Sequence, residues 1–106
     1  MLNKDESRVL TACRVDMILL RTRVEIQPEQ MLADIQATHK TVAAILNIGG
    51  KRLNQEERRV MREANQQLYL SCEDIEKHKD ITAAGERLGA FCMLLETVVA
   101  GEVKAK

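Results

Sequence analysis

Apolar residues recur at intervals of three and four along almost the whole chain. This spacing predicts four helices, at about residues 4–26, 29–48, 54–79 and 82–100. The most regular stripe belongs to the last helix and consists of Ile81, Ala84, Leu88, Phe91, Leu95 and Val98. The core stripe of the first helix consists of Leu10, Cys13, Met17, Leu20 and Val24. Because such stripes face neighbouring helices in a bundle, the pattern predicts an all-α fold.

Residues that begin and end helices lie between the four segments. Pro28 suits the first turn of the second helix, where no backbone N–H is needed. Asn54 and Glu57 have the spacing of a capping box at the start of the third helix. Thr82 is a candidate cap for the last helix, and Gly101 follows its predicted end. The short connections predict antiparallel neighbours within a single helical domain, residues 1–106.

The composition narrows the fold class further. Of the 106 residues, 45% are hydrophobic, 2% are aromatic and one is proline. The apolar content excludes intrinsic disorder, and the shortage of aromatic residues and proline argues against a β-sandwich or barrel. The expected fold is therefore an antiparallel helical bundle of about four helices, completed or extended by homodimerisation.

The expectation of a homodimer comes from apolar residues beyond those that one core requires. The first helix has a second apolar stripe, which includes Val15, Leu19 and Ile26. The last helix also has apolar residues away from its main stripe. Either the first helix is central in the monomer, or it is buried against another chain, and we favour a two-fold dimer. The predicted self-association interface consists of Val15, Ile18, Leu19, Thr22, Ile26, Met93 and Leu94.

Two glycines in the last helix, Gly85 and Gly89, are separated by one helical turn. Glycine in a helix interior costs about 1 kcal/mol relative to alanine, so the pair indicates close approach of a neighbouring group. We interpret the pair as ordinary close packing, because this spacing drives helix association mainly in membranes.

Candidate catalytic and metal-binding residues are scarce. The two histidines, His39 and His78, lack the Glu-x-x-His spacing of a di-iron bundle. The three cysteines fall at core-like positions far apart in the sequence, which indicates reduced, inert thiols rather than disulfides. We therefore expect no enzyme activity, no cofactor and no metal site.

The compartment is inferred from the absence of targeting features in the sequence. The first eight residues are too charged for a secretory signal, and the longest apolar stretch is shorter than the roughly 20 residues that a bilayer requires. The sequence therefore predicts a cytoplasmic protein without a membrane partner.

Charge is balanced overall but uneven along the chain. The 16 basic and 16 acidic residues give a formal net charge of zero, whereas residues 51–62 hold five basic and two acidic groups. This segment supports an alternative function as a nucleic-acid-associated regulator, although interleaved glutamates favour a solvated helix face. The candidate phosphate-binding residues are Arg14, Arg21, Lys51, Arg52, Arg58, Arg59 and Arg62.

The leading functional hypothesis is a small non-enzymatic interaction module that acts as adaptor, regulator or inhibitor of a larger protein. Tyr69 is the only tyrosine and lies opposite the core stripe of its helix, so its ring should be mostly exposed. Tyrosine and arginine are enriched at interface hot spots. Arg58, Arg62 and Tyr69 are therefore the candidate residues for binding that larger protein, although a ring lying along its own helix would also explain Tyr69.

Overall fold

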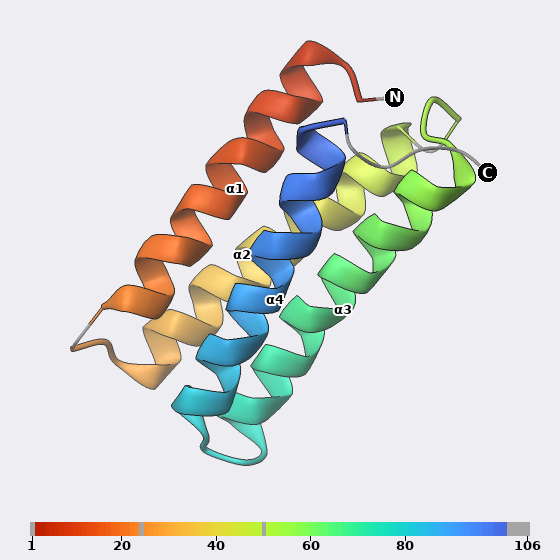
Figure 1. The fold of residues 1–106 in the computed structure, drawn as a ribbon. Helices are drawn as coiled ribbons and strands as arrows, with labels where there is room; N and C mark the ends of the chain where they lie inside the picture. The colour runs from red at the N-terminus through yellow and green to blue at the C-terminus, as the bar shows by residue number, and fades with distance from the viewer. Residues whose placement is uncertain (1, 24, 50, 102–106) are drawn as a thin grey trace.

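The computed structural model describes residues 2–23, 25–49 and 51–101, and within these ranges the chain forms a bundle of helices (Figure 1). The helices are α1 (Lys4–Thr22), α2 (Pro28–Gly49), α3 (Gln55–Glu76) and α4 (Ile81–Val99). They run alternately up and down in a bundle that measures 39 × 21 × 21 Å. The prediction of an all-α bundle is confirmed.

Capping residues explain where α1 and α3 begin. The predicted box is present in α3, where the Asn54 side chain accepts a hydrogen bond from the Glu57 N–H at 2.8 Å and Glu57 accepts one from the Asn54 N–H. An equivalent box of Asn3 and Glu6, which the apolar pattern does not reveal, begins α1. Each box satisfies two backbone donors that the first helical turn leaves without partners.

Two helices end earlier than the sequence predicts. The first helix ends at Thr22 rather than residue 26, because Arg23 is extended, with φ −66° and ψ 130°, and the chain must reverse before Pro28. The core position predicted at Val24 lies outside the described residues. The third helix ends at Glu76 rather than residue 79, because the chain reverses through Lys79, whose φ is 53°.

The cap of α4 also differs from the prediction. Asp80 caps the helix, accepting a hydrogen bond from the Ala83 N–H at 2.9 Å, whereas Thr82 already lies within the first turn. Aspartate and threonine are both good caps, so the sequence alone does not decide between positions two residues apart.

The core lies along the axis of the bundle. It is formed by aliphatic side chains from all the described helices around Phe91, which is fully buried. The most extensive packing joins α3 to α4, and α1 packs mainly against α4. By contrast, α1 makes few contacts with α2. One flank of α1 is therefore only weakly covered by the rest of the bundle.

The residues that the structure describes include no helix with the combination of length and apolar character needed to cross a membrane.

A buried carboxylate links the start of α1 to the end of α2. The Glu6 side chain accepts a hydrogen bond from the Arg52 guanidinium and lies beside Gly49, where a Cβ atom would come within 2.7 Å of Glu6 Oε2. The ion pair with Arg52 is the largest factor that lowers the pKa of Glu6. Glycine at position 49 therefore leaves the space that this ion pair occupies.

We predict that Glu6→Gln lowers the free energy of unfolding by about 1 kcal/mol at pH 7, because glutamine can retain the capping box but not the ion pair. A carboxyl group with a lowered folded-state pKa stabilises the protein above its ordinary pKa, near 4.5, and loses that effect as the pH falls through the folded-state value. Urea unfolding of both proteins between pH 3 and pH 7 should show that the difference in their free energies of unfolding becomes smaller as the pH falls. A difference independent of pH would contradict this account.

Candidate interaction surfaces

The weakly covered flank of α1 has a regular stripe of residues. Asp5, Val9, Ala12, Asp16 and Leu19 are spaced four, three, four and three apart, which keeps them on one side of α1. Arg23, the extended residue that follows the helix, lines a hollow together with Leu19, and we call these six residues the α1 stripe. Leu19 is 59% exposed and Val9 is 42% exposed. Beside the stripe, Asp16, Leu19 and Arg23 line a hollow of about 310 Å³ with Asp34, Ala37 and Thr38 of α2. The stripe is therefore a seam of apolar residues interrupted by Asp16, with a charged residue at each end and no neighbouring helix fully covering it.

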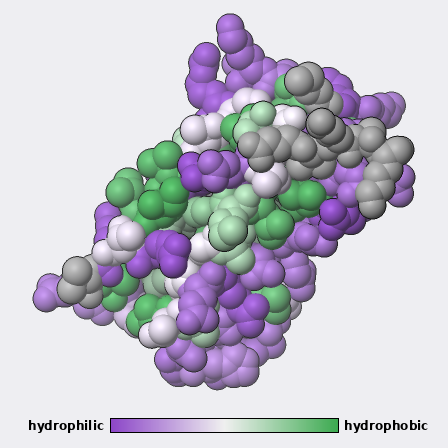
Figure 2. Space-filling view, in the orientation of Figure 1, coloured by the Kyte–Doolittle hydropathy of each residue, from purple (hydrophilic) through white to green (hydrophobic). Residues whose placement is uncertain are grey.

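Further exposed apolar residues lie on α1 and α4. Val15 borders the α1 stripe, and Met93 of α4 is 73% exposed. The space-filling view shows hydrophobic surface over both of these helices, interrupted by hydrophilic side chains (Figure 2). Met93 follows Cys92, whose carbonyl faces Arg14 of α1, so Met93 is turned outward on α4 rather than towards the stripe.

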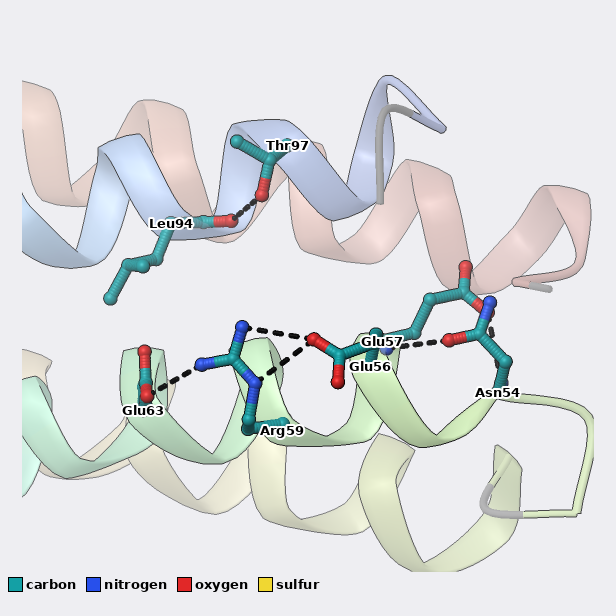
Figure 3. Close-up of polar contacts among 7 residues, drawn as sticks. All are labelled: Asn54, Glu56, Glu57, Arg59, Glu63, Leu94 and Thr97. Atoms are coloured by element: carbon teal, nitrogen blue, oxygen red, sulfur yellow. Dashed lines mark hydrogen bonds and ion pairs between the residues drawn. The ribbon is translucent and has the colours of Figure 1, made fainter. Parts of the chain in front are cut away.

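The structure does not bring the seven predicted self-association residues together on one surface. Three of them are partly buried and pack against the core, namely Ile18, Ile26 and Leu94. Ile26 lies beyond the end of α1 and so cannot continue a helical stripe. Leu94 extends from α4 towards α3 (Figure 3). The Thr22 hydroxyl donates a hydrogen bond to the Leu19 carbonyl at 3.0 Å. The remaining residues, Val15, Leu19 and Met93, are the exposed apolar members of the set.

The two glycines of α4 have different surroundings. A Cβ atom at Gly89 would come within 2.8 Å of the Arg21 guanidinium, so this glycine accommodates an arginine of α1. Nothing lies within 4 Å of the equivalent position at Gly85. Close packing therefore explains Gly89 but not Gly85.

The candidate nucleic-acid residues are dispersed, and several of them already pair with carboxylates. Arg59 is held by Glu56 at 3.0 Å and by Glu63 at 2.8 Å (Figure 3). Arg52 pairs with Glu6. Arg14 bonds to Glu96 at 3.2 Å on the flank of α1 that faces α4. The basic groups of segment 51–62 are thus partly neutralised by carboxylates of the same chain.

A groove follows the contact between α2 and α3 and contains three hollows in a row. The first, of about 330 Å³, is lined by His39, Leu46, Arg62, Asn65, Gln66 and Tyr69. The second, of about 310 Å³, shares His39 and Tyr69 with the first and also reaches Lys40 and Glu76. The third, of about 440 Å³, shares Glu76 with the second and is lined by apolar residues that include Leu32 and Ile75. We call this row of hollows the α2–α3 groove.

Tyr69 lies at the centre of the α2–α3 groove. Its ring is 48% exposed and lies 6.4 Å from the His39 ring, with the two planes tilted by 46°. A hydrogen bond with Glu73, together with the negative charge of that carboxylate, raises the pKa of the phenol. The sequence indicated the exposure but not the neighbouring histidine, because periodicity alone does not pair residues on different helices.

The cysteines are buried and do not form a reactive site. Burial raises the pKa of Cys13 and Cys92, and it raises that of Cys72 to about 11. A thiol must lose its proton to act as a nucleophile or metal ligand. In the described parts of the chain, no three His, Cys, Asp or Glu residues are grouped so that they could hold a metal ion.

Comparison of the chain with protein-family models, curated proteins and solved structures finds no match. The α1 stripe and the α2–α3 groove are therefore the two candidate interaction surfaces of the bundle.

We predict that the thiols of the folded protein react slowly with iodoacetamide at pH 8. With a pKa of about 11 instead of 9.0, the Cys72 thiolate is about 100-fold less abundant in the folded protein than in an unfolded chain. Mass spectrometry of timed samples, with and without urea, gives the two rates. Rapid labelling of Cys72 without urea would show that its environment is not as described.

Proposed function

We propose that this chain is a small non-enzymatic interaction module that works as a homodimer and presents its remaining helix faces to a larger protein. The observation that carries the proposal is the exposed seam on the weakly covered flank of α1, with Leu19 at 59% exposure. A seam of this spacing is typical of helices that pack against a partner helix.

The order of residues in the α1 stripe suits pairing with its own copy. In an antiparallel two-fold arrangement centred near residue 14, Val9 of one copy lies opposite Leu19 of the other. The same register places Asp5 of one copy opposite Arg23 of the other. The outer pairs are thus complementary in apolar and charged character, whereas Ala12 of one copy lies opposite Asp16 of the other, which limits the apolar area and therefore the affinity.

Net charge also supports self-association. With a formal charge of zero, two copies do not repel one another at long range. Among the described residues, Asp5 and Arg23 have no ion pair within the monomer, so both are available to a second chain.

The dispersion of the basic residues favours a protein over nucleic acid as the further partner. Phosphate binding gains from several unpaired cations on one surface. Here Arg14, Arg52 and Arg59 pair with carboxylates on different sides of the bundle.

We predict that sedimentation equilibrium gives a mass near twice 12.0 kDa and that Leu19→Glu shifts the protein to the monomer. The added carboxylates would face the apolar residues of the other copy without a partner. Met93→Glu is the matched control, because Met93 is even more exposed but lies away from the α1 stripe. A monomeric wild-type protein, or equal dissociation by both variants, would contradict the proposal.

Charge reversal gives a second measurement of the same interface. Asp5→Arg or Arg23→Asp alone should weaken the dimer, because each places like charges opposite one another. The double variant should restore it, because the pairs return with reversed sign. Loss of the dimer in the double variant, with circular dichroism unchanged, would exclude the antiparallel register.

A further inference from the structure

The α2–α3 groove contains cationic and polar groups that neither the core nor the α1 stripe uses. Within the described ranges, no ion pair holds Arg62 or Lys40, in contrast to Arg59 on the outer side of the same helix as Arg62. Arg62, Gln66 and His39 line the first hollow, and none of its lining residues is acidic. The lining of this end of the groove therefore offers hydrogen-bond donors and positive charge, although the Glu73 carboxylate lies near Tyr69.

A buried amide in the same hollow lacks a partner. The Asn65 side-chain oxygen is inaccessible to solvent and accepts no hydrogen bond from any described residue. A buried oxygen without a partner is rare in folded proteins, and a donor such as a backbone N–H of a bound polypeptide is one way to satisfy it, whereas a carboxylate is not. The first hollow thus combines a guanidinium with an amide whose hydrogen-bonding capacity is not fully used.

The opposite end of the groove has a different character. Its hollow is lined by Leu32, Ile75 and Ile81 and also by charged residues of both signs, Glu29, Glu76 and Lys79. Leu46 and Leu32 are 14 positions apart on α2, so the basic and apolar ends are separated by about 20 Å. An elongated, open groove of this kind suits a polypeptide better than a small molecule, which is usually enclosed by its pocket.

We propose that the α2–α3 groove binds an acidic segment of a partner protein. A carboxylate of the segment bonds to Arg62 and Gln66 beside the Tyr69–His39 pair, and an apolar side chain of the segment enters the hollow at Leu32 and Ile75. The first hollow, which has no acidic residue in its lining, receives the carboxylate, and the hollow of Leu32, Ile75 and Ile81 receives the apolar side chain, so the segment binds in one direction. This inference rests on the interaction role proposed above but not on self-association.

The test is an NMR titration of the ¹⁵N-labelled full chain with two blocked, alanine-based helical peptides of about 15 residues. One peptide has two leucines near one end and three glutamates near the other, and the second has glutamines in place of the glutamates. We expect the acidic peptide to shift the amide signals of His39, Arg62, Gln66 and Tyr69, and to bind at least about tenfold more tightly than the glutamine peptide.

Two variants separate the groove from general charge effects. Arg62→Gln should weaken binding of the acidic peptide about tenfold or more, whereas Arg59→Gln, with the same charge change on the same helix, should alter it less than about twofold. Equal loss in both variants, equal binding of both peptides, or no shifts in the groove would overturn the proposal.

Other occupants give distinguishable results. If acetate shifts the same signals as strongly as the peptide does, the ligand of the groove is a free carboxylate. If a short oligonucleotide binds more strongly than the peptide, the ligand is nucleic acid. Shifts in the groove that depend on protein concentration alone would assign a second copy of this chain. Each of these outcomes overturns the acidic segment, and failure of peptide binding by a dimeric protein would leave the self-association proposal intact.

Discussion

The packing of α4 between α1 and α3 is the contact on which the rest of the bundle depends. With one phenylalanine and no tryptophan, the chain builds its core from aliphatic side chains around Phe91, and α4 supplies the surface that both neighbours share. This arrangement satisfies one flank of α1 and leaves the flank towards α2 with little to pack against. An amphipathic helix normally buries its apolar residues, and for this reason we propose that a second copy of the chain covers the α1 stripe.

The two uncovered surfaces differ in chemistry, which is why we assign them different partners. The α1 stripe has apolar residues on both sides of Asp16 and opposite charges at its two ends, and its outer positions are complementary to their own reverse. The α2–α3 groove changes from basic near Arg62 to an apolar hollow near Ile75 that carries charges of both signs, and this order does not complement itself. A dimer formed through α1 would leave the groove of each copy open to a larger protein.

The sequence predicted the features that depend on local rules. Periodicity identified the helices, and the Asn54–Glu57 spacing identified a cap, because both depend on residues within a few positions. The failures concern tertiary geometry. Ile26 has the right spacing for the second stripe but lies past the end of α1, where the chain must turn towards Pro28. Leu94 is off the main stripe of α4 but is partly buried, because α3 packs closely beside it. The meeting of His39 with Tyr69 depends on how α2 and α3 align, which single-helix patterns do not encode.

The central claim is that α1 of one copy packs against α1 of another. Isotope-filtered nuclear Overhauser spectroscopy on a mixture of ¹³C-labelled and unlabelled chains detects only contacts between copies. The account predicts intermolecular signals between the methyl groups of Val9 and those of Leu19, as the antiparallel register requires. Intermolecular signals from Met93 without any from Leu19, or no intermolecular signals in a concentrated sample, would contradict it.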